Sequence, residues 1–303
     1  MTFWKYLRIG YAIVADAIGH FIDDDGPAIA SHVALSSLMA IFPFLIFVAA
    51  LSGFIGFHDV AEMATDLIFE AWPKQVAGPV SSEIDSVLTQ PRGDLLTFGV
   101  IVTLWFSSNG VEAVRAALNR SYRVKETRSW IWCRVQSIIA VLIGSIVLMI
   151  FTLLIIVGPL VWSEATKLIP HLANLDYHAN IIRYGGTSVL LIIALFVAHL
   201  VLPNGKRGVL EVLPGVFLTV FLWVGFGSAF GIYLANFAHY VSLYAGLAGI
   251  MTALIFMYLT AAIFIIGGEF NAAILRQRNI GKFKKSKALL QAASSVAQDG
   301  TKE

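Results

Sequence analysis

Seven polar side chains lie inside or at the ends of long apolar stretches, where lipid cannot solvate them. Ionisable groups at membrane depth are costly, so each is a candidate functional residue. Histidine titrates near neutral pH, so such a group could exchange protons while it holds a polar head group or an ion. The seven residues are His32, Ser36, Asn109, Glu112, His199, Glu269 and Asn271.

Part of this group lies on one face of the first apolar stretch. Spacings of i, i+4, i+7 and i+11 place four residues in one helical stripe, namely His32, Ser36, Met39 and Pro43. Pro43 has no N–H group to donate to the carbonyl of Met39, so we expect a kink in the helix. The free carbonyl must then find a hydrogen-bond partner in neighbouring protein or water. The stripe predicts one wall of a polar cavity. Alternatively, His32 and Glu269 reach the membrane surface and the serines bond their own helix.

The composition is that of a membrane protein. Of the 303 residues, 58% are hydrophobic and 13% are charged, against about 25% charged in soluble domains. Apolar stretches of about 18 or more residues can cross the hydrocarbon core as helices. We therefore predict an all-α integral membrane protein with six transmembrane helices, at 31–57, from 95, 135–162, 184–202, 209–234 and 243–275.

The distribution of basic residues gives an orientation. If both termini are cytoplasmic, the cytoplasmic segments hold 17 of the 21 Lys and Arg residues, as the positive-inside rule requires. The outer loops hold the other four, which are Lys74, Arg92, Lys167 and Arg183. This orientation brings the seven polar residues to the inner ends of the first, second, fourth and sixth spans. We therefore predict that they form a cavity open to the cytoplasm.

Three regions of different character are expected. Residues 1–27 have the apolar spacing of an amphipathic helix lying in the inner interface. Residues 28–280 form the six-helix domain, in which 58–93 contain two apolar faces separated by AWPKQ and predict an amphipathic helical hairpin on the outer surface. This hairpin caps a cavity or simply packs on the spans. Residues 281–303 are basic, then small and polar, and predict a disordered cytoplasmic tail.

Basic residues after the second span suggest membrane lipids as partners. Arg115, Arg120 and Arg123 lie at the predicted cytoplasmic face, where they could hold an anionic head group. Envelope proteins are possible further partners, and the sequence leaves the oligomeric state open. We expect no nucleic-acid partner, because the positive-inside rule already accounts for the basic stretch.

The motifs of several enzyme classes are absent from the sequence. There is no GxxxxGK[ST] for nucleotide-driven work, no HExxH for zinc and no GxSxG for acyl transfer. The single cysteine, Cys133, excludes an intramolecular disulfide and CxxC chemistry. We therefore expect no enzyme, no bound metal and no cofactor.

Four segments in order resemble the YihY/BrkB family of bacterial inner-membrane proteins, over roughly residues 10–280. They are ASHVALSSLMAIFPFLIF, LWFSSNGVEAVRAALNRSYRV, LPGVFLTVFLWVGFGSAFGIYLANFAHY and YAGLAGIMTALIFMYLTAAIFIIGGEFNAAI. The resemblance implies a multi-pass protein of the bacterial inner membrane with six spans and cytoplasmic termini. It also implies an envelope role, since some members are called virulence factors and some are linked to lipid or lipopolysaccharide traffic.

An older label for the family is ribonuclease BN, and the residues argue against it. A ribonuclease needs a metal or a paired acid and base in an aqueous site, with a basic groove for phosphates. The basic stretch from Arg115 to Arg134 instead flanks a helix and follows the positive-inside rule.

Three functions remain. The first is transport or translocation of an envelope lipid or amphiphile through the polar cavity. The second is secondary transport of a small solute or ion at a site formed by broken helices, for which Pro43, Gly158–Pro159 and Pro214–Gly215 are candidate breaks. The third is a non-transporting scaffold that recruits envelope proteins.

Overall fold

A computed structural model of the chain describes residues 2–55, 93–152, 154–155, 158–169, 176–241 and 245–299. Within these residues the regular structure is helical and contains no strand, which confirms the predicted all-α class. The described helices are α1 (Thr2–Asp23), α2 (Gly26–Ile55), α5 (Gly93–Ser121), α6 (Trp130–Thr152), α7 (Gly158–Leu168), α8 (Asp176–Val201), α9 (Val209–Val241) and α10 (Ala245–Asp299).

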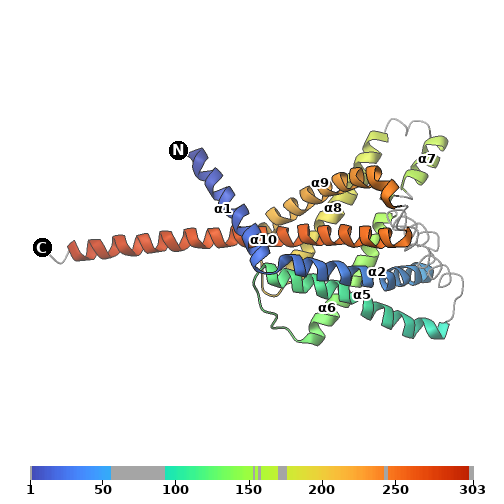
Figure 1. Cartoon of the computed structure of the whole chain (residues 1–303), viewed down its shortest axis with the longest axis horizontal. Helices are drawn as coiled ribbons and strands as arrows, with labels where there is room; N and C mark the ends of the chain where they lie inside the picture. Colours follow the sequence, from blue (N-terminus) through green and yellow to red (C-terminus); the bar gives the residue numbers. More distant parts are fainter. Residues whose placement is uncertain are drawn as a thin grey trace.

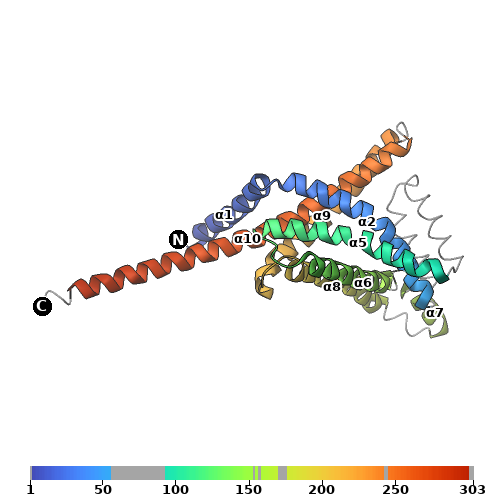
Figure 2. The same cartoon turned by 90° about the horizontal axis from the view of Figure 1, so that it is seen from below.

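Four described segments are long and apolar enough to cross a membrane, namely Gly26–Val48, Trp130–Thr152, Val209–Leu234 and Met251–Asn279. A shorter apolar segment, Gly185–Val201, lies in α8. They correspond to the first, third, fifth, sixth and fourth predicted spans. The six-span topology and the cytoplasmic termini stay predictions, although both chain ends lie at the same end of the bundle (Figures 1 and 2).

Two features differ from the sequence-based expectations. The tail predicted to be disordered continues α10 as one helix to Asp299, and it projects from the bundle (Figure 1). Its sequence is rich in Ala, Leu, Gln and Lys and lacks proline, so helix propensity explains the difference. The predicted third span ends as α6 at Thr152, and a separate helix, α7, begins at Gly158. The predicted hairpin at 58–93 falls almost entirely outside the described residues.

The core is formed where α2, α5 and α10 pack together through small side chains. Ala30 of α2, Ala113 and Ala117 of α5, and Ala261 and Ala262 of α10 are all buried in one cluster. Small residues let helix backbones approach closely, which is the usual basis of helix packing in lipid. A second apolar cluster joins α5, α8, α9 and α10 around Leu118, Val212 and Phe264. Pro43 lies inside α2, which stays helical on both sides of it, and the predicted kink stays a prediction.

Helices α9 and α10 make their closest approach at two glycines. A Cβ atom added to Gly267 would overlap the Oγ1 atom of Thr219 and the backbone oxygen of Gly215. A Cβ atom added to Gly215 would overlap the backbone oxygen of Gly267 and the side chain of Asn271. No side chain other than hydrogen fits at either position without moving the helices apart.

We expect Gly267→Ala to destabilise the protein by about 1–3 kcal/mol, because the added methyl group overpacks the contact between α9 and α10. Gly227→Ala is the matched control, since a Cβ atom at this exposed position of α9 meets nothing within 4 Å. Thermal unfolding of the purified protein in detergent measures both. Equal melting temperatures for the two variants would contradict this account of the contact.

Candidate functional site

Tyr122 connects two of the predicted polar residues in the core. Its Oη atom lies 2.9 Å from Nδ1 of His199 and accepts a hydrogen bond of 3.1 Å from Nδ2 of Asn271. Because Asn271 donates to the phenol oxygen, the phenol proton can be donated to His199. Burial raises the pKa of Tyr122 to about 12, so this proton is retained at neutral pH. His199 is fully buried, and its ring packs against Phe264.

Asn271 also bonds the backbone at the start of α9. Its Oδ1 atom accepts a 2.6 Å hydrogen bond from the N–H of Gly215, and its Nδ2 atom donates to the carbonyl of Val212 at 3.0 Å. These backbone groups flank Pro214, whose ring disturbs the helical hydrogen bonds around it. Asn271 therefore links α10 to α9 through hydrogen bonds.

Glu112 and Arg115 form an ion pair where α5 meets α6, in which Arg115 is buried and Glu112 is partly exposed. Nη1 of Arg115 contacts Oε2 of Glu112, while Nη2 donates to the carbonyl of Cys133 at 2.8 Å and to Oγ of Ser137 at 2.7 Å. Ser137 in turn donates to Oε1 of Glu112. Arg115 is 2% exposed, so it cannot meet a head group at the surface. One turn away, Asn109 accepts a hydrogen bond from Arg134 of α6.

Glu269 lies within a collar of charges that joins α1, α10 and the end of α5. It is 2% exposed, and its Oε2 atom lies 3.6 Å from Nη2 of Arg123 and 4.0 Å from Nη2 of Arg276. Arg123 also pairs with Asp24, and the other pairs of the collar are Arg120–Asp25 and Arg276–Asp16. Arg120 and Arg123 therefore already have carboxylate partners, and their role in binding head groups stays a prediction.

The loop after α5 is tied to the loop after α8. Asn204 donates to the carbonyl of Lys125, and its backbone N–H donates to Asn119. Asn119 donates to Glu126, which also receives hydrogen bonds from Arg128. The Arg128 hydrogen bond is the main reason that the pKa of Glu126 falls to about 2. Glu126 is therefore ionised at neutral pH and binds Asn119 and Arg128, the two residues that in turn contact Asn204 and Leu202 after α8.

The remaining two predicted residues do not join these clusters. His32 is exposed on α2 and Ser36 is half-buried. The structure thus divides the seven residues among separate helix contacts and the surface of α2, and none of the seven lines the cavity described next. Most of these polar side chains bond groups on other helices, whereas Nε2 of His199 and Oε2 of Glu269 are buried without a hydrogen-bond partner among the described residues.

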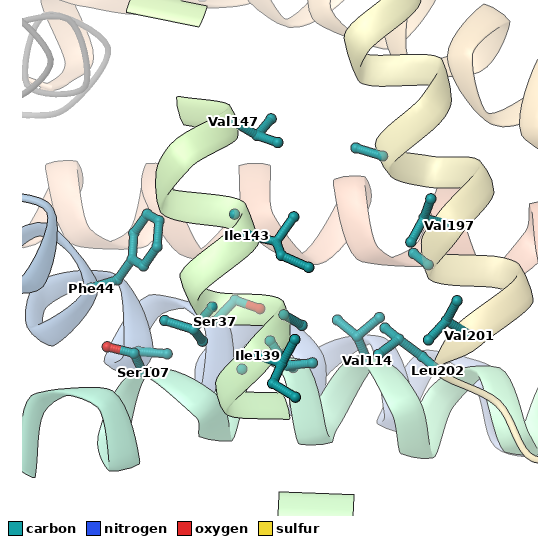
Figure 3. A pocket seen from close by; sticks show the side chains of 18 of the residues that line it. Ser37, Phe44, Ser107, Val114, Ile139, Ile143, Val147, Val197, Val201 and Leu202 are labelled. Atoms are coloured by element: carbon teal, nitrogen blue, oxygen red, sulfur yellow. The ribbon is translucent and has the colours of Figure 1, made fainter. Parts of the chain in front are cut away.

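An apolar cavity of about 570 Å³ lies between α2, α5, α6 and α8. Figure 3 shows Ile143 and Val147 of α6 facing Val197 and Val201 of α8, with Val114 of α5 nearby. Small residues create the space, among them Gly110, Ala140, Gly144, Ala194 and Ala198. Ile143, Val197 and Val201 are about half exposed, so the cavity opens sideways between α6 and α8.

Several of these residues are not singled out by sequence reasoning. Glycine and alanine in an apolar helix indicate close packing as readily as an empty space, so Gly144 carries no distinct signal. Tyr122 and Ser137 gain their importance from partners on other helices. The one available signal for Arg134 is its position inside an apolar helix, where a cation requires a partner.

We expect Glu112→Gln to destabilise the protein by about 3 kcal/mol, because it leaves the buried charge of Arg115 without its carboxylate partner. Arg115→Met alone should destabilise it less, because the side chain of Glu112 is 30% exposed. The double variant should be less destabilised than the sum of the two single variants. Thermal unfolding of all four proteins in one detergent gives the coupling. Additive effects would show that the pair is not energetically coupled.

Comparison with known proteins identifies one family and several relatives that match most of this chain. The profile of the family described as virulence factor BrkB matches residues 17–290. Ribonuclease-like protein YfkH of Bacillus subtilis is 29% identical over 265 residues, covering 84% of this chain and 92% of that protein. A UPF0761 membrane protein of Rhodospirillum centenum is 26% identical over 86% of this chain, and another from Legionella pneumophila is 25% identical over 88%.

The match spans 57% of the length of the Rhodospirillum protein and 63% of the Legionella protein. No solved structure matches the chain. The family profile covers most of the sequence, including all four segments that resemble the YihY/BrkB pattern. The chain therefore belongs to the virulence factor BrkB family of membrane proteins.

Proposed function

We propose that this protein binds an envelope lipid or similar amphiphile and moves it across the bacterial inner membrane. The apolar cavity between α5, α6 and α8 carries this proposal. Its volume of about 570 Å³ falls within the roughly 300–1,000 Å³ of small-molecule sites. It is lined almost entirely by aliphatic side chains and opens sideways, which suits an acyl chain entering from the bilayer.

One end of the cavity offers polar contacts for the head of an amphiphile. Gln136 lines the cavity, donates to the carbonyl of Val201 at 2.8 Å and accepts a 3.0 Å hydrogen bond from Arg128. Arg128 also donates to the carbonyl of Leu202. These bonds join α6 to the end of α8, so they would have to open for a head group to pass at this end.

The residues proposed to contact the head group differ from the seven polar residues that the sequence predicts to line a cavity. Five of the seven predicted residues contact other polar groups of the protein, and none of the seven lines the cavity, so we assign the acyl chain to the apolar cavity and the head group to Gln136 and Arg128. The name of the Bacillus relative, ribonuclease-like, does not fit this arrangement, because the cavity offers aliphatic contacts and no cradle for phosphates.

We expect Gly144→Phe to reduce acyl-chain binding by about tenfold, because the ring would displace at least two methylene groups, each worth about 0.8 kcal/mol. A Cβ atom at Gly144 meets nothing within 4 Å, so the ring can enter the space. Gly225→Phe is the matched control, since Gly225 also has open space but does not line the cavity. The measurement is crosslinking of a phospholipid that carries a photoreactive group on its chain.

Translocation is measured separately, as the transbilayer movement of a fluorescent phospholipid in liposomes containing the protein. Faster movement than in protein-free liposomes, lost in Gly144→Phe and kept in Gly225→Phe, is the expected result. Equal crosslinking of both variants would refute the cavity as the binding site. Specific crosslinking without lipid movement would leave a lipid-binding protein and refute translocation.

A further inference from the structure

We propose that Arg134, together with Trp105 and Trp130, forms a binding site for the phosphate of an anionic phospholipid, separate from the cavity. None of the three residues lines the cavity. Trp105 belongs to α5, while Trp130 and Arg134 belong to the first two turns of α6. The site therefore lies near the end of a membrane span, where lipid head groups begin.

Arg134 is held in place by neutral groups. Its Nη1 atom donates to Oγ of Ser108 at 2.6 Å and to Oδ1 of Asn109 at 2.9 Å. Its Nε atom is buried and has no hydrogen-bond partner among the described residues. The Nη2 atom of Arg134 makes no hydrogen bond to any described residue. Protein groups therefore orient the guanidinium without satisfying it.

The charge of Arg134 also lacks a carboxylate partner, unlike the charges of most arginines near it. Five arginines near the same end of the bundle have a carboxylate within 4 Å, namely Arg115, Arg120, Arg123, Arg128 and Arg276, whereas Arg207 donates to backbone carbonyls and lies over the ring of Tyr122. Within the described residues Arg134 has no such partner. A cation close to low-dielectric lipid is stabilised strongly by a fixed anion, and the bilayer itself can supply one.

Two tryptophan rings shape the site. The guanidinium carbon of Arg134 lies 4.3 Å from the ring centroid of Trp105 and 5.9 Å from that of Trp130. The ring centroids lie 5.7 Å apart and the rings are tilted by 59°. Cation–π contacts of this kind fix the plane of the guanidinium, which suits the paired donors that phosphate accepts.

The same rings indicate a lipid as the source of the phosphate. Trp105 is 40% exposed and Trp130 is 64% exposed, and the adjacent Ile131 and Trp132 are 68% and 58% exposed. An exposed apolar surface of this kind suits the glycerol and upper chain region of a phospholipid, since tryptophan prefers the membrane interface. A soluble phosphate ion would use the guanidinium and leave this surface uncovered.

The test is a titration of the intact protein, in a neutral detergent, with phosphatidylglycerol and phosphatidylcholine, with bound lipids counted by native mass spectrometry. Wild type should prefer phosphatidylglycerol. Arg134→Gln should raise the dissociation constant for the first bound phosphatidylglycerol by about tenfold, as expected for the loss of one charged hydrogen-bonded contact. Arg278→Gln is the matched control, because it removes an exposed cation from α10.

Two further variants keep the test decisive if Arg134→Gln does not fold. Arg134→Lys keeps the charge without the planar donors, and Trp130→Leu removes an exposed ring. Each variant should weaken binding of the first phosphatidylglycerol several-fold. Equal binding by the Arg134 and Arg278 variants would overturn the proposal, as would displacement of phosphatidylglycerol by inorganic phosphate. Repeating the titration in Gly144→Phe separates this site from the cavity, because the Arg134-dependent step should persist there.

Discussion

The hydrogen bonds of Asn271 are the interaction on which the arrangement of the bundle depends. In hydrocarbon every polar backbone group must find a partner inside the protein. Pro214 disturbs the first turns of α9, and Asn271 of α10 bonds the N–H of Gly215 and the carbonyl of Val212 on either side of it. Since Gly215 and Gly267 have no side chains, the two backbones can come close enough for these bonds. Tyr122 and His199 then attach α5 and α8 to the same point.

The apolar pattern of the sequence predicts the helices well, because span length and composition are local properties. It also identifies polar residues that the structure buries, including His199, Glu269 and Asn271. It does not predict their partners, because these depend on which helices are neighbours and on how each helix is rotated. Glu112 faces Ser137 of α6 rather than a common cavity, and His32 faces outward. The basic, polar composition of residues 281–303 predicts disorder, whereas their helix propensity agrees with the continuation of α10 to Asp299.

Polar and apolar space are separated in this bundle. The polar side chains cross-link helices in pairs, at the contact between α5 and α6 and at the collar around Glu269. The open volume lies elsewhere, between α6 and α8, and is lined by aliphatic and small residues. The contacts that hold the helices together are therefore separate from the residues that line the open volume.

Helix α10 has a mechanical consequence. Its 55 residues correspond to about 83 Å at 1.5 Å per residue, whereas the hydrocarbon core is about 30 Å thick. The part beyond Asn279 extends about 30 Å past the candidate span. Because the helix is continuous, a tilt of about 10° in the span would move the far end of the extension by about 5 Å. The displacement of this end for a given tilt is therefore set by the length of the extension.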